Sequence, residues 1–217
     1  MPEFLGRREA MVASLRRRGF INDEKVERAM LKVERHLFVP EDQVFDAYRD
    51  TPLHIGQGQT ISAPHMVAMM LELLDLEEGQ KVLEVGTGSG YNAALVAEMV
   101  GAGGEVHSIE RIGELATTAR KRLAKAGYGR VNVVVGDGSK GLAEKAPFDR
   151  IMVTAAGPRV PEALRSQLRD GGIMLIPVGS MAMQDLVKVL RKGDRFEERR
   201  MGGVMFVPLI GEQAHRE

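Results

Sequence analysis

The sequence contains no cysteine among its 217 residues. Disulfide bonds, a thiolate nucleophile and zinc bound by cysteine are therefore excluded, although this absence says little about the cellular compartment. Lysine and arginine together number 30, as do aspartate and glutamate, so the formal net charge is zero. No net positive field therefore attracts the protein to nucleic acid or to an anionic membrane.

Long apolar segments are missing as well. No apolar run approaches the roughly 20 residues that a membrane-spanning helix needs, and the N-terminal residues lack the apolar core of a signal peptide. We therefore expect a cytoplasmic protein. The length suits one α/β domain with a small extension.

A glycine-rich stretch, residues 81–91, organises the rest of the chain. Its apolar first half predicts a buried strand, residues 92–99 predict a helix, and Gly86, Gly88 and Gly90 alternate between them. Glycine is needed where the backbone takes a positive φ or where a ligand touches the main chain. A helix N-terminus adds unpaired N–H groups. The stretch predicts a cradle for a nucleotide or nucleoside; a purely structural turn is the alternative.

The spacing of these glycines favours one kind of ligand. A dinucleotide fingerprint reads G-x-G-x-x-G, whereas this chain reads G-x-G-x-G and has Tyr91 where the last glycine would stand. Glu84 precedes the first glycine by two residues, and a carboxylate there would repel a pyrophosphate. S-adenosylmethionine, a nucleoside with a sulfonium and an ammonium group but no phosphate, fits better. A buried acid that fixes the turn is an equally compatible interpretation of Glu84.

A second polar stretch, residues 56–66, precedes another predicted helix. Pro64 is well tolerated in the first turn of a helix, and apolar residues follow it at helical spacing. We therefore expect Gln59, Thr60 and Ser62 on a loop at a helix N-terminus, where a carboxylate can be held. That Ser62 is simply the N-cap is an equally good interpretation.

Strands and helices alternate from the cradle onward. This order predicts a doubly wound, mostly parallel sheet, whose further strands are residues 105–110, 131–135, 148–154 and 171–177. Residues 184–190 and 196–199 then have a hairpin pattern. Class I methyltransferases dependent on S-adenosylmethionine add such antiparallel strands to a parallel core.

Acidic residues follow two of these strands. Glu110 stands 20 residues after Gly90, where a carboxylate of a βαβ unit accepts hydrogen bonds from ribose hydroxyls. An ordinary acid in the first turn of the next helix is the weaker alternative. Asp137, in Gly136-Asp-Gly138, could accept from an adenine amino group or simply form a turn.

The first 55 residues predict a helical cap. Residues 3–18 can form a helix that Gly19 ends, and Asn22 or Asp23 can cap a second helix that reaches about His36. The first helix is basic because it carries Arg7, Arg8, Arg16, Arg17 and Arg18. A nucleic-acid contact is one interpretation, and a solvated helix face is the favoured one because acidic residues balance the cluster overall.

Taken together, these segments identify a family. The chain resembles protein-L-isoaspartate (D-aspartate) O-methyltransferases over nearly its whole length. The cradle alone is weak support, because many methyltransferases share it. The loop Gly58–Met66 and the C-terminal block Gly202–Leu209 are specific to the family, and further matches are Leu83–Tyr91, Ile109–Arg111, Gly136–Gly138 and Phe148-Asp149.

This resemblance implies a repair enzyme that uses S-adenosylmethionine, releases S-adenosylhomocysteine and needs no metal. Its substrate is the free α-carboxylate of L-isoaspartyl residues in damaged proteins and peptides, with D-aspartyl residues as a second substrate named by the family. The methyl ester closes to a succinimide, whose hydrolysis returns some aspartate. We expect a monomer that binds neither nucleic acid nor membrane.

The resemblance also implies the site. Ser62 matches the active-site serine. Residues expected to bind the substrate are Thr60, Ile61, Ala63, His65, Val207 and Pro208. Residues expected to bind the cofactor are Gln59, Thr60, Glu84, Gly86, Thr87, Gly88, Ser89, Gly90, Asn92, Glu110, Arg111, Asp137, Gly138 and Thr154. The expected organisation is one domain over residues 1–217, divided into a cap (1–55), a cofactor-binding α/β core (56–180) and a C-terminal hairpin with a substrate lip (181–217).

The chemistry needs no strong base, because an isoaspartyl carboxyl group with a pKa near ~3.5 is already ionised at neutral pH. None of the five histidines need be catalytic, and Ser62 is expected to position the carboxylate by donating a hydrogen bond. An RNA or DNA methyltransferase is the nearest rival. It is disfavoured by the zero net charge and by residues 153–158, which lack an Asn/Asp-Pro-Pro-aromatic motif. The glycine spacing disfavours a nicotinamide oxidoreductase, and intact Ser62 and cradle glycines disfavour a non-catalytic binding module.

Overall fold

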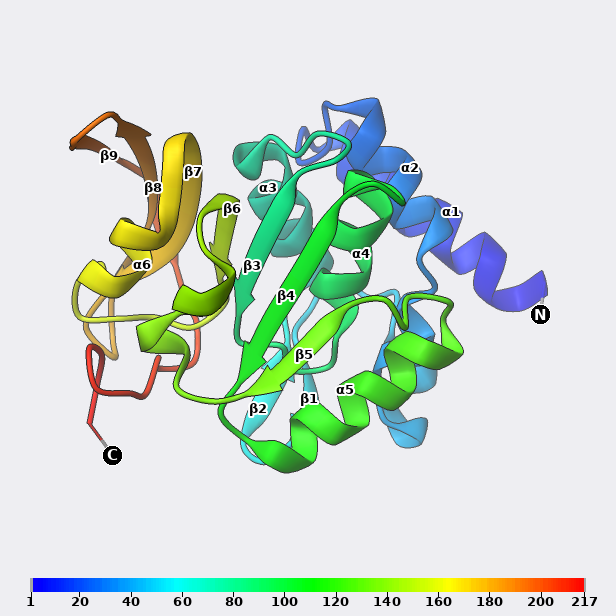
Figure 1. The fold of residues 1–217 in the computed structure, drawn as a ribbon. Coiled ribbons are helices and arrows are strands. Elements are labelled where there is room, and N and C mark those ends of the chain that lie inside the picture. The colour runs from blue at the N-terminus through cyan, green and yellow to red at the C-terminus, as the bar shows by residue number, and fades with distance from the viewer. Residues whose placement is uncertain (1, 217) are drawn as a thin grey trace.

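Seven strands form one sheet in the order β5-β4-β3-β6-β7-β8-β9 (Figure 1). This computed structural model describes residues 2–216. Strands β3 to β7 run parallel, while β8 and β9 are antiparallel to their neighbours. The predicted parallel sheet and closing hairpin are therefore confirmed. The strands are β3 (Lys81–Val85), β4 (Glu105–Glu110), β5 (Asn132–Val135), β6 (Phe148–Val153), β7 (Leu168–Gly179), β8 (Gln184–Lys192) and β9 (Arg195–Val204).

Helices and a small hairpin surround this sheet. The α-helices are α1 (Pro2–Arg17), α2 (Glu24–Lys32), α3 (Pro64–Leu74), α4 (Tyr91–Val100), α5 (Gly113–Lys125) and α6 (Glu162–Gln167). Short 3-10 turns are η1 (Arg35–Phe38), η2 (Glu41–Asp46), η3 (Gly138–Lys140) and η4 (Ala143–Lys145). A separate two-stranded sheet consists of β1 (Leu53–Gly56) and β2 (Gln59–Ile61), where the sequence predicted only a loop.

The second helix is shorter than predicted. It ends at Lys32 rather than near His36, and Val33 takes an extended conformation. Val33 and Arg35 are both almost completely buried, yet side chains two positions apart in an α-helix point to different sides. The extended residue therefore lets both side chains face the interior. Asp23 caps the helix by accepting from the Lys25 N–H, so the cap is Asp23 and not Asn22.

The sheet has a hydrophobic core on each face. Successive residues of β7 show this, because Ile173 and Leu175 belong to one buried cluster, and Met174 and Ile176 belong to the other. The first cluster joins β-strand residues to the cap and to α3, α4 and α5. The second lies under α6 and the C-terminal residues that follow β9. Since cap and sheet share the first cluster, we propose that the chain folds as one domain.

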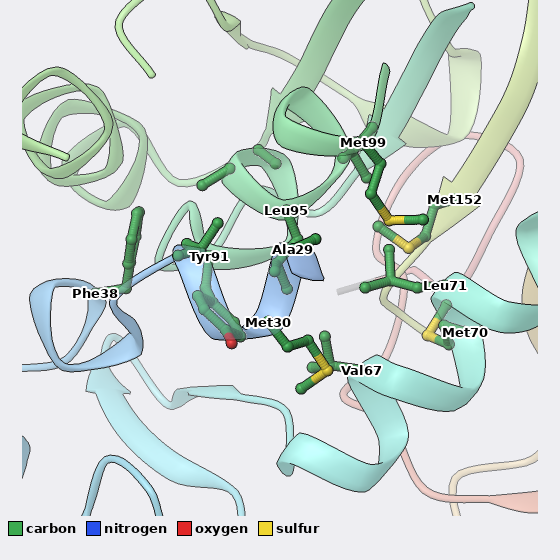
Figure 2. Packing of buried hydrophobic residues seen from close by; sticks show 14 of the residues in the cluster. Ala29, Met30, Phe38, Val67, Met70, Leu71, Tyr91, Leu95, Met99 and Met152 are labelled. Carbon is green, nitrogen blue, oxygen red and sulfur yellow. The ribbon is translucent and has the colours of Figure 1, made fainter. Parts of the chain in front are cut away.

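The cap packs directly on the helices that flank the cradle. In Figure 2, side chains of the cap meet side chains of α3 and α4 in one cluster, among them Ala29, Met30, Phe38, Val67, Tyr91 and Leu95. Each of these six side chains is at most 1% exposed. Because Tyr91 is the first residue of α4, this packing places the cap against the end of the glycine cradle.

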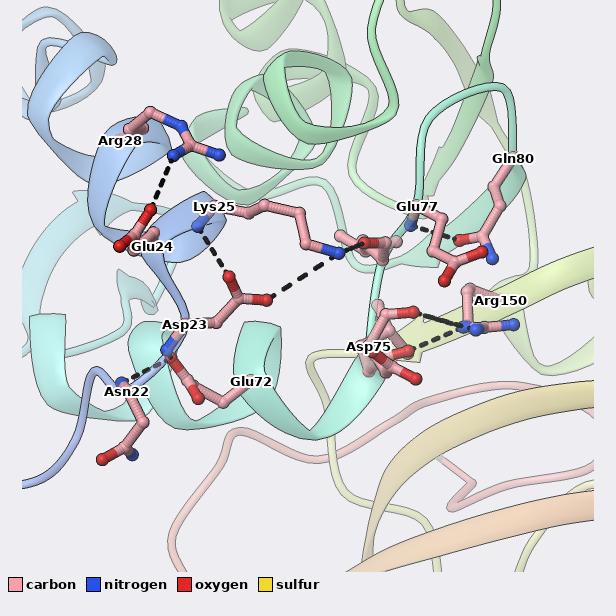
Figure 3. Close-up of polar contacts among 12 residues, drawn as sticks. Asn22, Asp23, Glu24, Lys25, Arg28, Glu72, Asp75, Glu77, Gln80 and Arg150 are labelled. Atoms are coloured by element: carbon pink, nitrogen blue, oxygen red, sulfur yellow. Dashed lines mark hydrogen bonds and ion pairs between the residues drawn. The ribbon is translucent and has the colours of Figure 1, made fainter.

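Polar contacts fix the cap against α3 (Figure 3). Glu72 of α3 accepts from the N–H groups of Asn22 and Asp23 at 2.8 Å each, where α2 begins. At the same C-terminal end of α3, Arg150 of β6 donates to the carbonyl oxygens of Leu74 and Asp75. The last turn of the helix that precedes the cradle is therefore held both by the cap and by the sheet.

Three of the five arginines in the basic cluster of residues 7–18 are paired with acids of the cap. Arg8 lies 3.1 Å from Glu34, Arg18 lies 2.6 Å from Asp50, and Arg16 pairs with Glu27. Such pairing agrees with the interpretation of a solvated helix face. Gly19 has a positive φ of 76° and ends the helix as predicted. Within residues 2–216, no helix is long and apolar enough to cross a membrane.

Candidate active site

The glycine cradle connects β3 to α4 through three residues with positive φ. Gly86, Gly88 and Gly90 have φ values of 95°, 52° and 89°. A Cβ atom on Gly86 would lie 2.4 Å from Oγ1 of Thr154. That hydroxyl donates to the Gly86 carbonyl oxygen at 2.7 Å. Residue 86 therefore has to be glycine, both for its conformation and for the closeness of β6.

Glu84 lies beneath the cradle and is completely buried. Ser108 donates its hydroxyl hydrogen to the Glu84 carboxyl group at 2.5 Å, and Thr87 joins the same chain of hydrogen bonds. Burial raises the pKa of Glu84 to about 8, an effect that the Ser108 hydrogen bond opposes and the charge of Glu110 increases. Glu84 is thus mostly uncharged at neutral pH, so charge repulsion at this position does not select the ligand. The geometry is that of a buried acid that holds the turn.

Glu110 is also buried, but it lies at the end of β4 and faces the cradle. Its Oε2 accepts from the N–H of Gly88 at 2.9 Å, and its Oε1 accepts from the N–H of Ile112 at 3.0 Å. Each carboxylate oxygen can accept about two hydrogen bonds. Both oxygens therefore retain capacity for donors, such as hydroxyl groups, that enter from the adjoining cavity.

Ser62 lies between the β1–β2 hairpin and α3. Pro64 begins α3, and its N-cap is Ala63, which makes no side-chain capping bond. The interpretation of Ser62 as the helix cap is therefore wrong. The hairpin turns at Gln57 and Gly58, both of which have positive φ, and so brings Gln59 and Thr60 to the same place as Ser62.

Arg35 is a site residue that belongs to no predicted motif. Its guanidinium is completely buried, with Nε donating to the Ala47 carbonyl oxygen at 2.7 Å and Nη2 donating to the Ser62 carbonyl oxygen at 2.8 Å. It also lies 5.0 Å from the ring centre of Tyr91, a distance typical of a cation–π contact. Burial lowers its pKa to about 10, so the group is still cationic at neutral pH. Its partners are main-chain carbonyls and a ring, which leave no recognisable spacing in the sequence.

A cavity, here called the cradle cavity, brings most predicted site residues together. Predicted residues that line it are Gln59, Thr60, Ile61, Ser62, Gly86, Thr87, Gly88, Ser89, Asn92, Glu110, Arg111, Gly138, Thr154, Val207 and Pro208. The prediction missed the apolar wall, which consists of Val85, Tyr91, Ile109, Ile112, Ala155, Leu209 and Ile210. Apolar residues next to a motif look like ordinary core in the sequence, so only their place in the fold distinguishes them.

Three predicted cofactor residues do not line the cradle cavity: Glu84, Gly90 and Asp137. Gly90 is the N-cap of α4, and its missing side chain leaves room for Leu123, 3.2 Å from where a Cβ would lie. Asp137 accepts from the N–H groups of Ser139 and Glu212 at 2.9 and 2.8 Å. It thereby caps η3 and anchors the C-terminal tail, so these contacts differ from the expected contact with adenine.

A second cavity, here called the open groove, adjoins the first. Ala63 and His65, which do not reach the cradle cavity, line this groove instead. The two cavities share Thr60, Ser62, Thr154 and Val207. The lip that contains Val207 is held by Ala156, whose N–H donates to the Val207 carbonyl oxygen and whose carbonyl accepts from Leu209, each at 2.8 Å. Ser62 therefore stands where an enclosed, glycine-lined cavity opens into a surface groove.

No metal site is evident in the part of the chain that the structure describes, since no three His, Asp or Glu side chains there cluster suitably. The site instead offers backbone donors, one carboxylate acceptor and hydroxyl groups. Such a set can bind a nucleoside and orient a second molecule beside it. It contains no pair of groups arranged as nucleophile and base.

Comparisons with known proteins agree with this geometry. Residues 6–214 match the profile of the family described as Protein-L-isoaspartate(D-aspartate) O-methyltransferase (PCMT). A protein-L-isoaspartate O-methyltransferase from Methanopyrus kandleri is 57% identical over 212 residues, which cover 97% of this chain and 94% of the relative. One from Methanothermobacter thermautotrophicus is 55% identical over 207 residues, with coverages of 94% and 95%.

A solved structure is similar in fold as well. A Plasmodium falciparum chain, described as a beta-aspartate methyltransferase and crystallised with S-adenosyl-L-homocysteine, superposes with a TM-score of 0.84. It is 28% identical, and the match covers 94% of this chain and 98% of that one.

The buried guanidinium of Arg35 should be important for stability. We predict that Arg35→Met lowers the free energy of unfolding by roughly 2–4 kcal/mol, because two buried carbonyl oxygens lose their donors. Urea denaturation measures this change. Arg28→Met is the matched control, since Arg28 is exposed and pairs with exposed Glu24. An Arg35 variant as stable as the Arg28 variant would contradict the assignment.

The raised pKa of Glu84 predicts a pH-dependent stability. The unfolded carboxyl group ionises near pH 4.5 and the folded one near pH 8, so the stability that the protonated group contributes is lost as pH rises through this window. Glu84→Gln should lack this loss, so its stability relative to the wild type should increase between pH 5 and pH 8. The exposed Glu144→Gln variant controls for a general charge effect. Parallel pH profiles of Glu84→Gln and wild type would show that Glu84 is ionised in the folded protein.

Proposed function

The chain belongs to the protein-L-isoaspartate (D-aspartate) O-methyltransferase family, and we propose that Ser62 positions the acceptor at the junction of its two cavities. The protein is a repair enzyme that depends on S-adenosylmethionine and methylates the free α-carboxylate of isoaspartyl residues. The ester then closes to a succinimide, which hydrolyses in part to aspartate. The shared lining of the cradle cavity and the open groove carries the proposal, because methyl transfer requires two bound molecules to meet.

The residues of the cradle cavity fit S-adenosylmethionine. Gly86 and Gly88 line the cavity without side chains, so a nucleoside can approach the main chain there. Glu110 has spare acceptor capacity for ribose hydroxyls. When bound there, this cofactor supplies an electrophilic methyl group. We propose that the predicted cofactor residues lining the cavity hold it, and that Glu84, Gly90 and Asp137 support them.

Methyl transfer to a carboxylate requires little acid–base catalysis by the protein. The α-carboxyl group of an isoaspartyl residue has a pKa near ~3.5 and is therefore ionised at neutral pH. In-line placement of two reactants can contribute up to ~7–11 kcal/mol. We propose that the Ser62 hydroxyl donates a hydrogen bond to one carboxylate oxygen and thereby orients the other toward the cradle cavity. Val207 and Pro208, on the lip, would keep water from the reacting carboxylate.

Arg35 is proposed as the residue that positions Ser62. It donates to the Ser62 carbonyl oxygen from a fully buried place and so limits the movement of that segment. His65 has a similar supporting role on the groove side, since both its N–H and its Nδ1 contact Asp50 at 2.9 and 2.8 Å.

The favoured partner is a polypeptide and not a nucleic acid. Three of the five basic residues that could contact phosphates, Arg8, Arg16 and Arg18, are engaged with acidic residues of the cap. The open groove is lined by no lysine or arginine. These features support a proposal that RNA and DNA are not substrates.

Labelled methyl transfer tests this function. Three acceptors are compared: a peptide with one isoaspartyl residue, its twin with a normal aspartyl residue, and an RNA. We expect a base-labile methyl ester on the isoaspartyl peptide alone. Equal labelling of the aspartyl twin, or stable label on the RNA, would contradict the assignment.

Ser62 and Glu110 should separate turnover from cofactor binding. We predict that Ser62→Ala lowers kcat roughly 10- to 100-fold, because misplaced reactants lose in-line geometry, and leaves the Kd for S-adenosylhomocysteine nearly unchanged. Glu110→Ala should instead weaken that Kd roughly 10-fold or more, because hydrogen bonds to a carboxylate are lost. Steady-state kinetics and calorimetric titration measure the two constants, and circular dichroism confirms folding. An unchanged kcat for Ser62→Ala would contradict the role proposed for Ser62.

A further inference from the structure

We propose that three exposed methionines, Met181, Met183 and Met205, form an adaptable apolar rim that binds the side chains flanking the isoaspartyl residue. The partner is an extended polypeptide segment with apolar residues beside the damage. This methionine rim is a specificity determinant of the same site, and it rests on the proposed function.

The three side chains are far more exposed than apolar residues of this size usually are. Met181 is 64% exposed, Met183 is 80% exposed and Met205 is 82% exposed. Two come from the turn between β7 and β8, and the third follows β9. Although they are separated in sequence, all three line the open groove. A cluster of exposed apolar side chains around one groove indicates a binding surface.

The rim is continuous with the place where the acceptor carboxylate must lie. The groove that the methionines line also contains Ser62 and Thr60, which border the cradle cavity. An isoaspartyl residue has a neighbouring residue on each side in its own polypeptide. Those neighbours must extend from the reacting carboxylate across the surface of the enzyme. The open groove extends from Ser62 to the methionines, so the neighbouring residues of the substrate can lie along it.

The main chain beneath the rim is held in place, while its side chains are not. The buried amide of Gln184 accepts from the Phe206 N–H at 2.7 Å and donates to the Phe206 carbonyl oxygen at 3.1 Å. The Ser180 N–H donates to the Met183 carbonyl oxygen at 2.9 Å. Methionine is unbranched and has three rotatable side-chain bonds, so it can adapt to partners of different shape. Promiscuous binding proteins use such methionine-rich surfaces.

The charge of the groove supports an apolar partner. None of its lining residues is Asp, Glu, Lys or Arg. It therefore offers no ion pair to a charged neighbour of the isoaspartyl residue, whereas an apolar neighbour can bury surface against the methionines. Shape-tolerant apolar contact suits a repair enzyme whose substrate can occur in many sequences.

Kinetics with two peptides test the rim. Both peptides contain one isoaspartyl residue, flanked on each side by leucine in one peptide and by glycine in the other. The measured quantity is the ratio of kcat/KM for the leucine peptide to kcat/KM for the glycine peptide. In the triple variant M181Q/M183Q/M205Q we expect this ratio to fall roughly 5- to 10-fold, because the leucine side chains lose apolar contacts. The triple variant with leucine at the same positions should recover most of the wild-type ratio.

Met201→Gln is the matched control, because Met201 is 39% exposed on β9 and does not line the groove. It should keep the wild-type ratio. A wild-type ratio in the triple glutamine variant, or an equal fall of the ratio in the Met201 variant, would contradict the role proposed for the methionine rim. Failure of wild-type enzyme to methylate either peptide would instead overturn the function on which the inference rests.

Discussion

A single buried cation connects the three parts of this molecule that have to meet. Arg35 comes from the N-terminal cap, donates to the carbonyl oxygen of Ser62, and lies against the ring of Tyr91, where the cradle becomes α4. A buried charge is costly unless such partners surround it. Its contacts therefore make the positions of the cap, the segment around Ser62 and the cradle depend on one another. The cap is thus a structural part of the site.

Two carboxyl groups beside the cradle differ because their surroundings differ. Glu84 is enclosed beneath the turn, where burial raises its pKa to about 8 and the Ser108 hydroxyl donates to one of its two oxygens. Glu110 ends the neighbouring strand and holds the cradle through the Gly88 N–H while it faces the cavity. The first stabilises the turn, and the second is placed to bind a ligand. Parallel strands commonly bring such ligand-binding residues together beyond their carboxyl ends.

Local patterns predicted the sheet and the cradle, because strand runs, alternating glycines and a proline at a helix start are visible in neighbouring residues. Most other residues of the cavity were implied by the family resemblance. Local patterns could not predict interactions between distant residues. The Arg35–Ser62 bond spans 27 residues and ends on a main-chain carbonyl. Glu84 is engaged by Ser108, 24 residues away, and Asp137 by the N–H of Glu212, 75 residues away. These departures from the predicted site involve such long-range contacts.

We propose that donor and acceptor occupy separate cavities that meet at Ser62. A crystal structure with S-adenosylhomocysteine and an isoaspartyl peptide tests it most directly. We predict adenosine in the cradle cavity, with its ribose hydroxyls on Glu110, and the peptide carboxylate within hydrogen-bond distance of the Ser62 hydroxyl. A peptide bound away from the open groove, or a carboxylate that Ser62 does not contact, would contradict the account.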